Sequence, residues 1–164
     1  MDVLKRKAAF ELLDSLKINY TVDEHPAAFT IDEIKAFGIG GKGEIIKNLF
    51  LRDDKGKRLF LVCLMGEKRA DLSLIREQLC CTKLGFACEE KLQKYLGQTK
   101  GSVSPLGVGS DSESFVEIVL DSDLACCDLI GVHPNDNTAT VWLKYDDLLK
   151  VLKVNNSTIS IIKI

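Results

Sequence analysis

The chain has 164 residues, 46% of them hydrophobic, and a formal net charge of −2. This length fits one domain with a sizeable core, which we expect to cover residues 1–164. Because the chain lacks a run of roughly 18 apolar residues and starts with a charged segment, we expect neither a membrane span nor a signal peptide, and therefore a cytoplasmic protein. The net negative charge argues against a generic binder of DNA or other nucleic acids, because phosphates attract positive charge. A local basic face stays open, and its candidates are Lys5, Arg6, Lys7, Lys42, Lys47, Arg52, Lys68 and Arg69.

The first part of the chain predicts two helices with a strand between them. Apolar residues recur at helical spacing over residues 2–17, which predicts an amphipathic helix. Residues 18–26 form a β-rich run that ends at a proline, so we expect a short strand there. Thr30 precedes a predicted helix over residues 31–37, and Glu33 stands at the spacing of a capping box.

The clearest pair of elements is a hairpin. Two β-rich runs, residues 45–52 and 58–64, flank the turn sequence DDKGK. The second run is almost continuously apolar, which is typical of a strand buried on both faces.

The rest of the chain predicts short elements joined by polar turns. Residues 97–112 hold many Gly and Ser residues, so we expect a long loop of the kind that is functional or disordered in compact domains. Strands and helices are interleaved without regular alternation. This order predicts an α+β fold with a mixed, strongly curved central β-sheet surrounded by helices. The other expected helices cover residues 72–80, 88–96, 121–127 and 145–153, and the other expected strands cover 85–88, 114–121, 128–132, 138–144 and 157–164.

The six cysteines favour reduced, mostly buried thiols in an intracellular protein. None lies in a C-x-x-C pattern, and two pairs are adjacent in sequence, where a bridge would be strained. A zinc or redox site is the alternative, although the only two histidines, His25 and His133, are far apart in the chain. We therefore expect no metal and no cofactor. The cysteines are Cys63, Cys80, Cys81, Cys88, Cys126 and Cys127.

Common catalytic fingerprints are missing from the sequence. The segment GIGGKG follows a predicted helix and matches neither the P-loop nor the dinucleotide-binding pattern. The nucleophile-elbow pattern G-x-S-x-G is also missing.

Lys47 is the first candidate functional residue. Strand alternation places it on the same face as Leu49 and Leu51, which elsewhere would be the core face. A lysine that points inward needs an anion, a carboxylate or a pocket, because burying it unpaired is costly. The alternative is a lysine at a strand end whose ammonium reaches water.

The segment GVHPNDNTAT, residues 131–140, is the second candidate. Gly131 permits a close approach by a ligand or another chain segment, and Pro134 fixes the backbone after His133. The following Asn and Asp residues can form turn hydrogen bonds or present amides to a ligand. An ordinary strand connection with a half-exposed histidine fits the sequence as well.

Four segments, taken in order, resemble the YbaK/ProX family, the free-standing relatives of the editing domain inserted in bacterial prolyl-tRNA synthetases. They are EHPAAFT (24–30), KNLFLRD (47–53), GSVSPLG (101–107) and GVHPNDNTAT (131–140), and the segments KRADLSLI and LGFACEEKL extend the resemblance over nearly the whole chain. One departure is Lys68, which stands where relatives often have an arginine-rich stretch.

The resemblance implies hydrolysis of the ester in a mischarged aminoacyl-tRNA, without a cofactor. The partner would be the acceptor end of tRNA(Pro), and the resemblance leaves open whether prolyl-tRNA synthetase also binds. Lys47 corresponds to the family's essential lysine, expected to hold the terminal adenosine near the ester. His133 would contact the substrate, and Gly131 would help to position the α-amine and the attacking water. Catalysis would rest on a positioned water, a stabilised oxyanion and the 2′-hydroxyl of the tRNA.

The other substrate-binding residues that the resemblance implies lie in the same four motifs. Asn137 and Thr138 would hold the His133 loop or touch the terminal nucleotide, and Lys5, Arg6 and Lys7 are further candidates for phosphate contacts. The remaining expected wall residues are His25, Pro26, Thr30, Asn48, Ser102, Pro105, Gly107 and Pro134.

The first helix and the HPNDNTAT loop most resemble the alanine-specific ProX branch, which predicts Ala-tRNA(Pro) as the substrate. Cys-tRNA(Pro) and Ser- or Thr-charged tRNA are the alternatives within the family. Two further hypotheses are a module that binds tRNA or a synthetase without catalysis, and a redox or metal-responsive protein that uses the paired cysteines.

Overall fold

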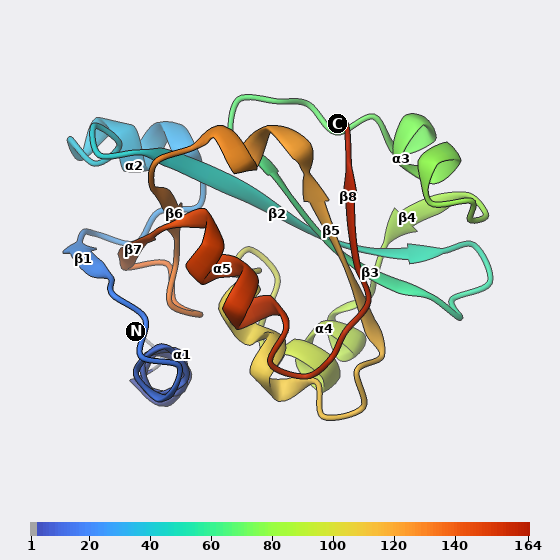
Figure 1. The fold of residues 1–164 in the computed structure, drawn as a ribbon, viewed down its shortest axis with the longest axis horizontal. Helices are drawn as coiled ribbons and strands as arrows, with labels where there is room; N and C mark the ends of the chain where they lie inside the picture. Colours follow the sequence, from blue (N-terminus) through green and yellow to red (C-terminus); the bar gives the residue numbers. More distant parts are fainter. Residues whose placement is uncertain (1–2) are drawn as a thin grey trace.

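The computed structural model describes residues 3–164 as an open, mixed β-sheet flanked by helices (Figure 1). The α+β class and the mixed sheet predicted from the sequence are confirmed. The helices are α1 (Val3–Ser15), α2 (Ile31–Ala36), α3 (Leu72–Gln78), α4 (Glu89–Leu96) and α5 (Tyr145–Leu152), with the 3-10 helices η1 (Pro105–Ser110) and η2 (Ser122–Cys126). The strands are β1 (Thr21–Glu24), β2 (Glu44–Asp53), β3 (Leu59–Met65), β4 (Leu84–Phe86), β5 (Val116–Asp121), β6 (Ile130–Val132), β7 (Ala139–Leu143) and β8 (Ile159–Ile162).

The long strand β2 is the centre of the sheet, whose strand order is β1-β7-β6-β2-β3-β5-β8, with β4 also paired to β2. The predicted hairpin of β2 and β3 is present, with Ile46 opposite Met65 and Arg52 opposite Leu59. The other edge of β2 has two partner strands. The start of β2 pairs with β6 in parallel, and the end of β2 pairs with β4 antiparallel.

Two hydrophobic clusters pack against the two faces of the sheet. The larger cluster includes buried residues of α1, α4 and α5, which lie together on one side, and α3 contributes Ile75 to the smaller cluster (Figure 1). Alternate residues of β3 belong to different clusters: Leu61 packs in the larger one and Phe60 and Val62 in the smaller. The expectation that β3 is buried on both faces is confirmed.

Local signals explain where several helices begin and end. Thr30 and Glu33 form the expected capping box at the start of α2. Asp71 accepts hydrogen bonds from two backbone amides at the start of α3, and Gly97 ends α4 with a left-handed φ of 64°. The predicted first helix begins at residue 2, which lies outside the described residues, so its start is described only from Val3.

Two expectations need correction. Residues 97–112 are not one long loop, because Pro105–Ser110 form η1, whose first four residues are buried. The short helix expected over 121–127 is present, as the 3-10 helix η2. The prediction of mostly buried cysteines is wrong, since the structure buries Cys63 alone among the six free thiols, and three are exposed. The others stand at turns and helix ends, where solvent reaches the side chain; they are Cys80, Cys81, Cys88, Cys126 and Cys127.

Within residues 3–164, every helix is too short or too polar to cross a membrane.

Candidate functional site

A cavity of about 790 Å³ lies along the open edge of β2. Strand β6 pairs with Glu44 and Ile45, and β4 pairs with residues 51–53. Between these two pairings, no strand in residues 3–164 covers this edge of β2. The cavity lies in that interval, and its size falls within the usual range of small-molecule sites, roughly 300–1,000 Å³.

The open interval also presents backbone groups to the cavity. The amide of Glu44 donates to Leu129 O on this edge, and the carbonyl of Phe50 accepts from Ala87 N on the same edge. Because backbone groups alternate in direction along a strand, those of Ile46 and Asn48 face this edge as well. Side chains from both faces of β2 can therefore reach one space.

Lys47 projects from the face of β2 that it shares with Leu49 and Leu51, as expected from the alternation. Leu51 belongs to the smaller cluster and Leu49 packs against it. The Lys47 ammonium donates to the carbonyl oxygen of Lys68 at 2.6 Å, and the side chain is half-buried. Lys47 lines the main cavity and also a second cavity of about 580 Å³, whose wall carries the ion pair between Lys35 and Glu67. The ammonium is thus held by a backbone oxygen at the junction of two cavities.

His133 lies on the cavity wall immediately after β6. Burial lowers the pKa of His133 from 6.5 to about 4, against smaller raising effects of the Val103 backbone and the Asp136 carboxylate. The imidazole is therefore neutral at pH 7. A neutral ring keeps one nitrogen that can accept a hydrogen bond.

Two polar atoms in the cavity wall have no protein partner. Four buried side-chain N or O atoms in residues 3–164 lack a hydrogen bond, and two of them are Asn48 Oδ1 and His133 Nδ1. Both residues line the main cavity. Buried polar atoms usually find partners, so an unsatisfied pair in one cavity is the arrangement expected where a ligand supplies the missing hydrogen bonds.

A buried polar network holds the His133 loop. The Ser104 hydroxyl donates to His133 O at 2.6 Å, and the Ser104 amide donates to Gln98 Oε1 at 2.9 Å. The Gln98 amide group in turn donates to Ser104 O and to Asn135 Oδ1. Gln98 and Ser104 are fully buried, so this network fixes the cavity wall from behind. A Cβ at Gly107 would lie 2.2 Å from Gln98 Nε2, which explains the glycine there.

A second set of contacts joins the loop before α2 to the same histidine loop. The amide of Ala28 donates to Asn137 O, and the amide of His25 donates to Thr138 O. The His25 ring contacts Thr140 Oγ1 through Nε2 at 3.1 Å and stacks on Phe37. His25, Asn137 and Thr138 thus support the wall from outside the cavity.

The structure brings together five of the predicted site residues on the main cavity wall: Lys47, Asn48, Thr30, Gly131 and His133. Gly131 has a packing role as well, because a Cβ there would lie 2.8 Å from the ring of Trp142. The other predicted substrate-binding residues lie outside the set that lines the cavity; they are His25, Pro26, Ser102, Pro105, Gly107, Pro134, Asn137 and Thr138.

Several lining residues were not predicted from the sequence. Phe29, Val103 and Thr140 belong to the quoted motifs, and this placement was the available signal. Phe86 lies in the quoted segment LGFACEEKL, and Lys100 directly precedes the motif GSVSPLG; both are exposed. Phe29 and Phe86 are 72% and 66% exposed, so the cavity has an aromatic rim on which a flat ring could stack.

Most cations of the proposed basic face pair with local carboxylates or donate to backbone oxygens. Arg6 pairs with Glu24, and Lys42 pairs with Asp23. Lys68 pairs with Asp121 and Asp123. These cations serve the fold in this structure. The remaining candidates outside the cavity are Lys5, Lys7, Arg52 and Arg69, and Lys7 pairs with Glu11.

The described residues, 3–164, contain no group of three or more His, Cys, Asp or Glu side chains arranged to hold a metal ion. The thiols also give little support to a redox site. Burial raises the pKa of Cys63 to about 12, and it raises the pKa of Cys81 and Cys127 as well, which disfavours the reactive thiolate.

The sequence model that describes the aminoacyl-tRNA editing domain matches residues 25–151, a range that contains all five predicted residues on the cavity wall. The chain belongs to the aminoacyl-tRNA editing domain family. It is therefore an aminoacyl-tRNA deacylase, an ester hydrolase, and the resemblance seen in the sequence is confirmed.

Individual relatives of this editing domain agree with the assignment. The chain is 45% identical to the prolyl-tRNA editing protein ProX of Acetoanaerobium sticklandii, over 100% of both chains. It is 36% identical to the prolyl-tRNA synthetase associated domain-containing protein 1 of Danio rerio, over 93% of this chain and 84% of that protein. A solved structure described as a candidate trans-editing enzyme for prolyl-tRNA synthetase superposes with a TM-score of 0.73 at 21% identity, covering 98% of this chain and 97% of that one, and supports the fold.

The buried network behind the editing cavity predicts different outcomes at two nearby glycines. Gly107→Ala places a Cβ 2.2 Å from Gln98 Nε2 and 2.7 Å from Leu96 O, so the network must break or shift. We expect the free energy of unfolding to fall by about 2 kcal/mol in a urea titration. Gly109→Ala is the control, because its Cβ meets only Leu12 Cδ2, at 3.4 Å, and should change stability by less than about 0.5 kcal/mol. Equal effects at both positions would contradict this account.

His133, a half-buried residue whose Nδ1 atom is buried, predicts a pH dependence of stability. The folded-state pKa of His133 is about 4 and its ordinary value is 6.5, so the unfolded chain takes up the proton first as the pH falls. The free energy of unfolding should therefore decrease between about pH 6.5 and pH 4, by at most about 3 kcal/mol from this residue. In an NMR titration, the chemical shift of the His133 ring protons should stay constant from pH 8 to pH 5.5. The resonance can be assigned by its absence from the spectrum of His133→Asn. A titration midpoint near 6.5 would contradict the burial.

Proposed function

We propose that this protein hydrolyses the aminoacyl ester of mischarged tRNA(Pro) in trans, and that Ala-tRNA(Pro) is its main substrate. The observation that carries the proposal is the cavity at the open edge of β2, which is lined by Lys47, Asn48 and His133, the last two of which each carry an unsatisfied buried polar atom. The relatives from A. sticklandii and D. rerio are named for prolyl-tRNA editing and prolyl-tRNA synthetase, which supports tRNA(Pro) as the substrate tRNA. The alanine preference is supported by the motifs shared with the ProX branch.

A separate editing site is useful because a synthetic site made for proline cannot strongly reject a smaller amino acid. Each missing methylene changes binding by only about 1–3 kcal/mol. A second cavity that accepts small side chains and rejects proline by shape supplies further discrimination. The apolar residues Ile46, Phe50 and Val132 line the wall next to the polar trio, and they suit a methyl side chain better than a charged one.

The hydrolysis needs a water that attacks the ester carbonyl carbon, while the bond to the ribose oxygen breaks. We assign the Lys47 ammonium to the oxygen that gains negative charge, or to the adjacent ribose and phosphate oxygens. Neutral His133, through Nδ1, and Asn48, through Oδ1, have the hydrogen-bonding capacity to hold the α-ammonium group and the attacking water. The proton that the water loses ends on the leaving ribose oxygen, and the 2′-hydroxyl of the terminal ribose can relay it by accepting this proton while it donates its own.

The rim of the cavity suits the unpaired end of a tRNA. Single-stranded nucleotides bind proteins through stacking on aromatic rings and through cations near the phosphates. Phe29 and Phe86 offer exposed rings, and Lys100 adds an exposed cation on the same wall. A short basic rim of this kind is compatible with a chain whose net charge is −2.

The proposal includes a cytoplasmic location and leaves the synthetase as a transient partner. Prolyl-tRNA synthetase makes the mischarged substrate, so the two proteins would act in sequence on one tRNA. We assign Asn137, Thr138, His25, Pro26, Ser102, Pro105, Gly107 and Pro134 to the support of the cavity wall in place of direct substrate contact.

A deacylation panel tests the substrate. We expect purified protein to release alanine from Ala-tRNA(Pro) at least about tenfold faster than cysteine from Cys-tRNA(Pro) or serine from Ser-tRNA(Pro), because a cavity matched to a methyl group discriminates by about 1–3 kcal/mol. Pro-tRNA(Pro) serves as the control and should stay intact. Rapid deacylation of Cys-tRNA(Pro) with Ala-tRNA(Pro) left intact would replace alanine by cysteine as the assigned substrate. If none of the charged tRNAs is deacylated, the protein would be a binding module without catalysis.

The lysine at the junction of the cavities predicts a second result. Lys47→Ala should lower the deacylation rate by about 100-fold or more, because it removes a charge placed next to the reacting ester. The melting temperature should change little, since the Lys47 side chain is only half-buried. Lys55→Ala, an exposed lysine in the distant hairpin turn, is the matched control. Near-normal turnover in Lys47→Ala would refute its role.

A further inference from the structure

Lys68 lies outside both cavities, yet its backbone carbonyl is the acceptor for the Lys47 ammonium, at 2.6 Å. Residues 65–68 form a turn after β3, closed by a hydrogen bond from Lys68 N to Met65 O. The direction of the Lys68 carbonyl therefore depends on how this turn is held.

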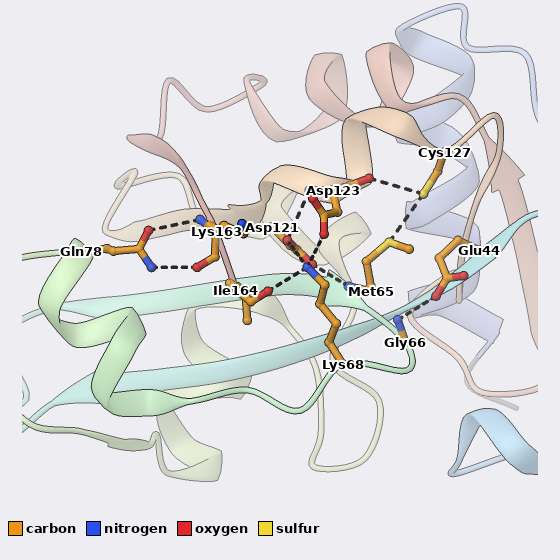
Figure 2. A network of polar contacts seen from close by, with 10 residues as sticks. All are labelled: Glu44, Met65, Gly66, Lys68, Gln78, Asp121, Asp123, Cys127, Lys163 and Ile164. Carbon is orange, nitrogen blue, oxygen red and sulfur yellow. Dashed lines mark hydrogen bonds and ion pairs between the residues drawn. The ribbon is translucent and has the colours of Figure 1, made fainter.

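Figure 2 shows that the Lys68 side chain anchors the turn on one side. Its ammonium donates to Asp121 Oδ1 at 2.9 Å, to Asp123 Oδ2 at 2.7 Å and to Ile164 O at 2.7 Å. Asp121 has a fully buried side chain and also accepts from Met65 N at 3.3 Å. Burial lowers the pKa of Lys68, but the hydrogen bonds that its ammonium donates to Asp123 and Asp121, together with their negative charges, outweigh this effect, so the pKa lies above its ordinary value and the ammonium stays charged.

The start of β2 holds the turn on the other side. The amide of Gly66 donates to Glu44 Oε1 at 2.8 Å (Figure 2), and a Cβ at Gly66 would lie 2.2 Å from Ile45 O. The turn is thus fixed between the start of β2 and the end of β5. Because the turn is fixed at both sides, the carbonyl of Lys68 has little freedom to change direction.

We propose that Lys68 is a positioning residue for Lys47: the ion pairs of its side chain with Asp121 and Asp123 fix the carbonyl that aims the Lys47 ammonium into the cavity. This inference rests on the proposed function, in which Lys47 acts on the ester. Lys68 itself touches no substrate. An error of about 1 Å in the placement of a catalytic group can lower a rate by about 100-fold, so the effect should be visible in kcat.

The sharpest test removes the ion pair and leaves no buried charge behind. In Lys68→Met/Asp121→Asn both partners become neutral, and we expect kcat for deacylation to fall about 10- to 100-fold with KM changed less than about twofold. The matched control is Arg58→Met/Glu117→Gln, which removes another ion pair that joins the segment around β3 to β5, at its other end. It should lose comparable thermal stability and keep its kcat. Lys68→Arg should keep most of the activity, because an arginine can still pair with both aspartates.

A second variant covers the case in which the double variant does not fold. Asp123 is exposed, so Asp123→Lys can fold while it repels Lys68, and kcat should fall about tenfold. Asp128→Lys, an exposed site with the same charge change, is its control and should keep normal kcat.

The outcomes separate this inference from the proposed function. If the wild type deacylates and Lys47→Ala is inactive, but Lys68→Met/Asp121→Asn and Asp123→Lys retain normal kcat, the positioning role is wrong and the function stands. If the wild type deacylates none of the charged tRNAs, the proposed function fails first. A selective rise in KM with kcat unchanged would assign Lys68 to binding and would also overturn the positioning role.

Discussion

The incomplete pairing of one strand is the constraint on which the site depends. Strand β2 is covered by β3 along one edge, but its other edge is shared between β6 and β4, with an uncovered interval between them. An interrupted edge costs backbone hydrogen bonds, and it opens a route to both faces of the sheet. Lys47 from one face and Asn48 from the other can therefore line one cavity, which a fully paired strand would keep apart.

The polar groups around this cavity are divided between a satisfied outer set and an unsatisfied inner pair. Gln98, Ser104 and Asn135 bond to one another and to the His133 carbonyl, so they make the wall rigid. Asn48 Oδ1 and His133 Nδ1 belong to residues that line the cavity, and both atoms are buried without a partner. A rigid support behind unsatisfied groups is what a hydrolytic site needs, because the groups can meet the substrate without first reorganising.

Local sequence patterns predicted the parts of the fold that depend on near neighbours. The β2–β3 hairpin, the capping box at Thr30 and the inward face of Lys47 follow from alternation and short spacing, and the structure has each of them. A strand was expected around Phe86, but its place at the cavity was not, because the pairing of this strand with β2 is a long-range contact that no local pattern indicates. The anchoring of Lys68 by Asp121 joins residues 53 positions apart, and no pattern in either segment indicates it.

The central claim is that an aminoacyl ester occupies the cavity with its carbonyl beside Lys47. A crystal structure with an amide-linked alanyl-adenosine, which resists hydrolysis, tests this claim most directly. The account predicts the alanyl group between Val132 and His133 and the amide oxygen within hydrogen-bonding distance of Lys47 Nζ. An analogue bound elsewhere on the protein, or a cavity that stays unoccupied at saturating analogue, would contradict it.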